Sequence, residues 1–168
     1  MKIKGKKKLN KAVTAQLAPF GIVKAKLGTT YCYFPPTEKI EFKLTENEIE
    51  DIWFEEFVKE RFGYETNYPF ILSLMHEVGH HQTIDEINGN FYLFCLQEKD
   101  RIENEMENTE NEAEAKKLEW QYFNLPDEIM ATQWAVNYMR NNPKEIKKMW
   151  KKIQKALQNF YIKNNVTD

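Results

Sequence analysis

The first quarter of the chain carries the hydrophobic pattern of short strands. Three segments rich in β-branched and aromatic residues, at 22–27, 30–34 and 39–44, are separated by glycine and proline. In the third segment apolar residues alternate with charged ones, which is the pattern of a strand buried on one face. We therefore expect a small antiparallel sheet of about three strands.

From residue 49 onward, apolar residues recur at helical spacing. The sequence Thr45–Glu48 has the form of a capping box and predicts where the first of these helices begins. Trp53 and Phe57 are expected in the core, and Gly63 is expected to end this helix. The expected fold is therefore α+β, with the small sheet packed on a mainly helical domain.

Further helices are predicted at 70–81, from 91 through 106, from 126 to before Pro143, and after Pro143. The last of them carries an apolar stripe made of Ile146, Met149, Trp150, Ile153, Leu157, Phe160 and Tyr161. Its opposite face is rich in lysine. We expect the stripe to pack on the domain's own core, and the lysines to be available to an acidic protein partner.

Length and composition indicate one domain over residues 1–168, with residues 1–11 as a flexible basic arm. A net charge of -2 gives no case for a nucleic-acid partner. The apolar runs are too short to span a membrane, so no membrane partner is expected. Cys32 and Cys95 are far apart and suit a reducing, cytoplasmic compartment.

The predicted helix at 70–81 ends in His-Glu-x-x-His. His76 and His80 lie four residues apart, so a helix points both imidazoles at one place, as a tetrahedral zinc ion requires. Glu77 lies about 100° around the helix. From there it can act as general base on a metal-bound water without being a ligand. All three histidines of the chain fall within residues 76–81.

Two features favour a metal site over a chance match. The preceding turns are apolar, and burying two histidines with a carboxylate but without a partner is costly. Gly79 also lies inside the pattern, although glycine costs roughly 1 kcal/mol against alanine within a helix. We expect another element to approach the backbone closely at this glycine.

The third ligand can be sought by elimination. His81 is adjacent to His80 and points elsewhere, so a downstream carboxylate is expected. Glu128 shares a helix face with Ala131, Thr132 and Ala135, and these small residues would let that helix lie against the metal helix. Asp127 and the acidic segment 103–114 remain alternatives.

His76-Glu77-Val78-Gly79-His80, followed by Glu128-x-x-Ala-x-x-Trp-Ala, resembles the zincin-like metallopeptidases of the ImmA/IrrE-like group and related phage or mobile-element proteins. That group shows His-Glu-x-Gly-His and then Glu-x-x-Ala-x-x-Phe-Ala on a later helix. The resemblance covers roughly residues 39–140. It implies a gluzincin-type zinc site with a third glutamate ligand, a small sheet beside the active helix, and peptide-bond hydrolysis.

These features predict a zinc metallopeptidase that acts on a polypeptide substrate, with residues 39–44 as a strand edge on which the substrate pairs. His81 is a candidate for stabilising the oxyanion or for orienting Glu77. Further candidates for stabilising the oxyanion are four tyrosines: Tyr64, Tyr68, Tyr122 and Tyr138. The alternative is a catalytically silent zincin-fold module that binds protein partners through segment 103–114 or the last helix.

Overall fold

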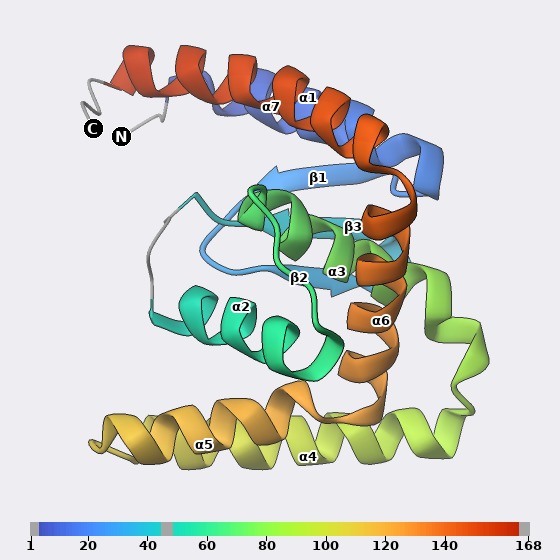
Figure 1. The fold of residues 1–168 in the computed structure, drawn as a ribbon, viewed down its shortest axis with the longest axis vertical. Coiled ribbons are helices and arrows are strands. Elements are labelled where there is room, and N and C mark those ends of the chain that lie inside the picture. Colours follow the sequence, from blue (N-terminus) through green and yellow to red (C-terminus); the bar gives the residue numbers. More distant parts are fainter. Residues whose placement is uncertain (1–3, 45–48, 165–168) are drawn as a thin grey trace.

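The computed structural model describes residues 4–44 and 49–164, and within these ranges it confirms a mainly helical α+β fold (Figure 1). The strands are β1 (Lys24–Leu27), β2 (Cys32–Phe34) and β3 (Lys39–Phe42). The α-helices are α1 (Lys6–Leu17), α2 (Ile49–Phe62), α3 (Pro69–Thr83), α4 (Gly89–Glu107), α5 (Glu112–Phe123), α6 (Pro126–Asn141) and α7 (Pro143–Asn164). The expected capping box at residues 45–48 lies outside the described residues.

The three-stranded sheet is mixed, so the prediction of an antiparallel sheet is wrong in one of its two pairings. The strand order is β1-β3-β2, in which β3 runs parallel to β1 and antiparallel to β2. β3 therefore lies in the centre, where Ile40 and Phe42 are almost fully buried. The alternation of apolar and charged residues identifies a strand but says nothing about its direction or its neighbours, so it could not reveal this order.

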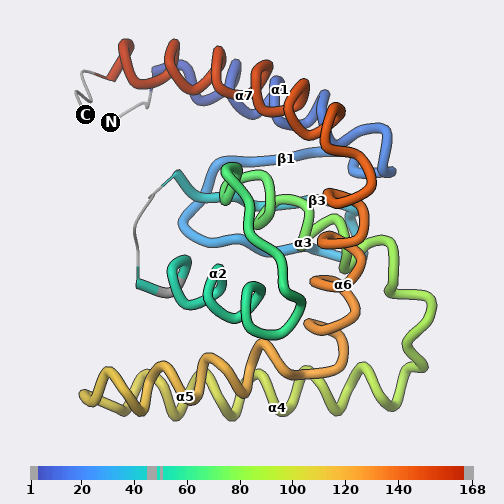
Figure 2. Tube along the Cα trace, in the orientation of Figure 1, coloured from blue at the N-terminus to red at the C-terminus, as the bar shows by residue number. Residues whose placement is uncertain are grey.

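The predicted basic arm at residues 1–11 is also wrong from Lys6 onward, because that part of the chain forms α1. Leu9, Val13 and Leu17 recur every fourth position and are fully buried, so packing of this apolar face holds the helix in place. α1 lies beside α7, and the two helices run across one end of the molecule (Figure 2). The lysine run at the start of the chain favoured a flexible arm, so the apolar face of this helix was not predicted.

Helix α1 also closes the outer edge of β1. The side chains of Asn10 and Thr14 accept hydrogen bonds from the backbone N–H groups of Leu27 and Ala25. An edge strand whose donors are already taken cannot add another strand. The open edge of the sheet is therefore that of β2.

The core is built largely as expected. Trp53 and Phe57 on α2 are buried. α2 ends at Phe62, and the next residue, Gly63, has a positive φ of 60°. On α7 the predicted stripe faces the interior, with Ile146, Met149, Ile153, Leu157 and Phe160 buried. No helix within the described ranges is both long and apolar enough to cross a bilayer.

Helices α3 and α6 make the closest contact between helices. A Cβ atom added to Gly79 would lie 2.2 Å from the backbone oxygen of Ala131. The small residues expected on the facing side of α6, Ala131, Thr132 and Ala135, are all buried. This contact confirms that another element approaches the backbone of Gly79.

We predict that Gly79→Ala destabilises the protein by about 1–3 kcal/mol or more, because the added methyl group meets rigid backbone rather than a flexible side chain. Gly89→Ala is the matched control, since a Cβ there has open space at the start of α4. Urea unfolding followed by circular dichroism measures both. Equal stabilities of the two variants would contradict the packing described here.

Candidate metal centre

The histidines of α3 and the first turn of α6 meet at one point. Pro69 begins α3, and the apolar residues that follow bury most of its length. His76 and His80 lie one turn apart on the side that faces α6. Pro126 begins α6, so Glu128 projects from its first turn towards the two imidazoles. Both helices start at a proline, as is common at the first helical position.

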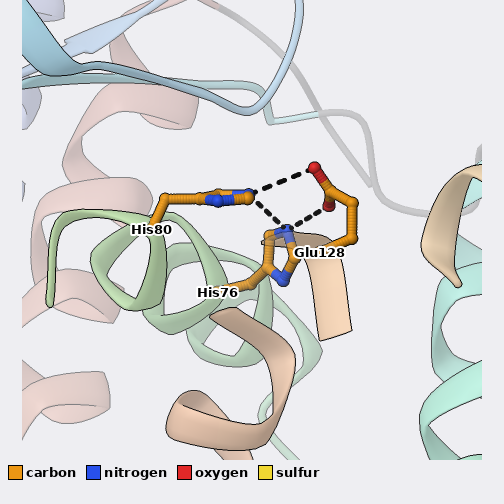
Figure 3. Close-up of side chains that lie close together, drawn as sticks. All are labelled: His76, His80 and Glu128. Atoms are coloured by element: carbon orange, nitrogen blue, oxygen red, sulfur yellow. Dashed lines mark hydrogen bonds and ion pairs between the residues drawn. The ribbon is translucent and has the colours of Figure 1, made fainter. Parts of the chain in front are cut away.

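The side chains of His76, His80 and Glu128 converge through the atoms that a metal would use (Figure 3). Nε2 of His76 lies 2.9 Å from Oε2 of Glu128, and Nε2 of His80 lies 3.3 Å from Oε1. The two Nε2 atoms are 3.2 Å apart. This buried group could hold a metal ion.

The spacing of these donor atoms fits a small tetrahedral ion. Zinc binds nitrogen and carboxylate oxygen at roughly 2.0–2.2 Å, which places neighbouring ligand atoms roughly 3.3 Å apart in a tetrahedron. The distances of 2.9, 3.2 and 3.3 Å in this group are near that edge length, with Oε2 of Glu128 next to His76 and Oε1 next to His80. Two imidazoles and one carboxylate are also the donor set of known catalytic zinc sites, which leave the fourth position to water.

Thr132 fixes the orientation of the first histidine. Its Oγ1 lies 3.0 Å from Nδ1 of His76, one turn beyond Glu128 on α6. If Nδ1 carries the proton and donates it to Thr132, the lone pair of Nε2 faces the ligand group. Such outer partners of a ligand set the tautomer and the ring orientation.

Glu128 is almost fully buried. Burial alone would raise the pKa of its carboxyl group, but His80, Lys99 and the hydrogen bond from His76 hold that pKa well below its usual value. The carboxylate form, which is the form that binds metals, is therefore the stable one.

Lys99, from the middle of α4, pairs with both Glu128 and Asp127. Burial would lower the pKa of its ammonium group, but these two carboxylates outweigh burial and raise it. Asp127 is thus bound by Lys99 and does not belong to the ligand group. The acidic segment 103–114 likewise contributes no member to that group. Nothing in the sequence distinguishes Lys99 among 24 lysines and arginines.

Glu77 is buried next to the ligand group but is not part of it. Burial raises the pKa of its carboxyl group to about 7, and the Coulombic effect of His76 and a hydrogen bond from the backbone N–H of Tyr33 oppose that rise. Tyr33 lies on β2, beside the cleft. The sequence predicted this strand but not which of its N–H groups meets Glu77.

His81 points away from the ligand group. Its Nδ1 lies 2.6 Å from the hydroxyl of Tyr33, and its Nε2 faces Gly21. His81 is therefore connected to Glu77 only through Tyr33, and it does not line the cleft at the ligand group. Of the four tyrosines considered from the sequence, Tyr122 lines that cleft.

A cleft of about 480 Å³ opens over the ligand group. It is bordered by residues 30–33 around β2, by α4 and α5, and by the start of α2. The expected substrate edge at residues 39–44 is wrong, because β3 is paired on both sides. The strand edge beside the cleft is that of β2.

Comparisons with protein-family models, with curated proteins and with solved structures find no match to this chain.

We predict that Thr132→Val lowers the affinity for a divalent metal about 10- to 100-fold, because His76 loses the partner that orients it. Thr83→Val is the matched control, since the buried hydroxyl of Thr83 bonds to the backbone of Gly79 and not to a ligand. Competition with a chromophoric zinc chelator measures both affinities. An unchanged affinity in Thr132→Val would remove this residue from the site.

We predict that Lys99→Met raises metal affinity while lowering the free energy of unfolding of the metal-free protein by about 3 kcal/mol. The ammonium group and a metal ion compete for the same oxygen of Glu128, and without Lys99 the carboxylate of Asp127 is buried without a counter-charge. Lys116→Met, which removes an exposed pair with Glu56, should change neither quantity appreciably. Weaker metal binding in Lys99→Met would show that Lys99 supports the ligands instead of competing for them.

Proposed function

We propose that the chain is a zinc-dependent metallopeptidase of the zincin-like type, with His76, His80 and Glu128 as metal ligands. The observation that carries the proposal is Glu77, a buried carboxylate that lies beside the ligand group without belonging to it. A site that only held a metal for stability would need no such carboxylate. The resemblance to the ImmA/IrrE-like group supports the same assignment.

In this proposal His76, His80 and Glu128 would hold the zinc ion, which when bound would lower the pKa of a water molecule that attacks the carbonyl group. Glu77 accepts the proton of that water at its carboxylate and then donates it to the nitrogen of the leaving amine. A pKa of about 7 suits a group that must both take and release a proton near neutral pH.

The open edge of β2 is suited to binding an extended polypeptide. β2 pairs with β3 along one edge, and residues 30–33 around its other edge line the cleft. A substrate strand paired along this edge would place its peptide bonds beside Glu77 and the ligand group.

Tyr122 and Lys99 are the donors that could stabilise the oxyanion. Burial and the nearby carboxylate of Glu128 raise the pKa of Tyr122, so its hydroxyl stays protonated and able to donate. Lys99 lies over the ring of Tyr122, at 5.4 Å from the ring centroid. We assign the hydroxyl of Tyr122 to the oxyanion, since Lys99 is already bound by two carboxylates.

We predict that Glu77→Gln retains metal affinity but cuts peptide hydrolysis by about 100-fold or more, the usual contribution of a general base. The zinc-loaded protein is incubated with a peptide library and the products are identified by mass spectrometry, with a chelator-treated sample as control. Glu119→Gln, another carboxylate that lines the cleft but is not adjacent to the histidines in α3, is the matched control and should retain activity.

Two results decide between the proposed functions. Hydrolysis by Glu77→Gln at the parent rate would exclude Glu77 as the base. Metal binding without hydrolysis of any library peptide by the parent protein would favour the silent binding module instead.

A further inference from the structure

Residues 91–96 of α4 form an unusually exposed apolar segment. Large apolar side chains are exposed at Phe91, Leu93, Phe94 and Leu96, while Cys95 alone is buried. The reason lies in the arrangement of the helices, because the N-terminal half of α4 runs past the end of α5 (Figure 1). Contiguous exposed apolar surface of this kind usually marks a binding site.

One side of this segment faces the cleft. Tyr92 and Leu96 lie one turn apart and line it together with Ile84 and Ile87, which precede α4. We call these four residues the apolar wall. Beyond Lys99 the same side of α4 becomes acidic, with Asp100 and Glu103 lining the cleft. The cleft thus has an apolar end and a charged end.

The apolar wall begins next to the ligand group. Lys99 contacts Glu128. Leu96 lies three residues before Lys99 on α4, or about 4.5 Å along the helix axis, and Tyr92 lies about 10 Å before Lys99. An extended peptide advances roughly 3.3 Å per residue. A side chain one to three residues from a bond at the ligand group would therefore lie against the wall.

We infer that the apolar wall is a specificity site that binds a bulky aliphatic or aromatic side chain of the polypeptide substrate. This inference rests on the proposed peptidase function. The occupant follows from two features of the cleft: the wall is continuous with the ligand group, and the β2 edge opposite it can hold the substrate's main chain. The selected side chain lies within three residues of the cleaved bond, and it is always on the same side of that bond in the substrate sequence.

The test compares two leucines of the same helix. Leu96 lines the cleft and is 38% exposed, whereas Leu93 is 57% exposed and does not line it. Since both are already exposed, changing either to serine should leave folding intact. Zinc-loaded parent and variants are assayed on a cleaved library peptide and on a version with alanine in place of its bulky apolar residue.

We expect the parent to prefer the apolar peptide about tenfold or more in kcat/KM, as hydrophobic pockets do. Leu96→Ser should lose most of this preference, and Leu93→Ser should keep it. The same ranking should appear in fluorescence anisotropy of peptide binding to the metal-loaded proteins carrying Glu77→Gln. A parent that cleaves both peptides equally, or equal preferences in the two serine variants, would overturn the inference.

The binding arm separates this inference from the proposed function. If the parent hydrolyses nothing but binds the apolar peptide in a manner that depends on Leu96, the peptidase assignment fails and the apolar wall stands. If peptides are cleaved without regard to Leu96, the wall fails and the peptidase stands. A dimer that Leu96→Ser dissociates in sedimentation would identify a second copy of the chain as the occupant and would also overturn the inference.

Discussion

The close packing of α3 on α6 is the contact on which the candidate site depends. The backbone of Ala131 occupies the space that a side chain at position 79 would need, so only glycine at position 79 permits the two helices to pack this closely. Glu128 precedes Ala131 by one turn, and His76 and His80 flank Gly79. The contact therefore fixes the distance between the two histidines and the carboxylate before any metal binds. A glycine that weakens the helix locally is compensated by the geometry it permits.

Charge is the second constraint on this region. Within the described part of the chain, Glu77, Asp127 and Glu128 are buried near one another, and Lys99 is the ammonium group that faces the last two. With all three carboxylates ionised, one lysine leaves an excess of two negative charges. A divalent cation would balance that excess, and buried charge that is not balanced is costly. Burial, together with the nearby charge of Glu128, raises the pKa of Glu77.

How far the sequence predicted this arrangement depended on the range of each interaction. Helical spacing within α3 and α6 was sufficient to identify His76, His80 and Glu128, since residues on one helix have known relative positions. Lys99 and Tyr33 could not be found in this way, because their contacts with the site depend on how separate elements pack. The direction and order of the strands were not predicted correctly for the same reason. α1 was not predicted although its pattern is local, because the lysines around Leu9 favoured a solvated basic arm over a helix with an apolar face.

Helix α4 carries both Lys99, which pairs with the carboxylates of the site, and part of the apolar wall. Its middle is tied to the site by the ion pairs of Lys99, and its C-terminal half packs against α5 through Ile102 and Leu118. Its N-terminal half runs past the end of α5, and the side chains of Leu93 and Leu96 in that half are exposed (Figure 1). A helix held at its middle and at one end can present its other end as a rigid surface without the cost of ordering a loop. The same lysine that balances the charge of Glu128 therefore also positions the apolar wall relative to the ligand group.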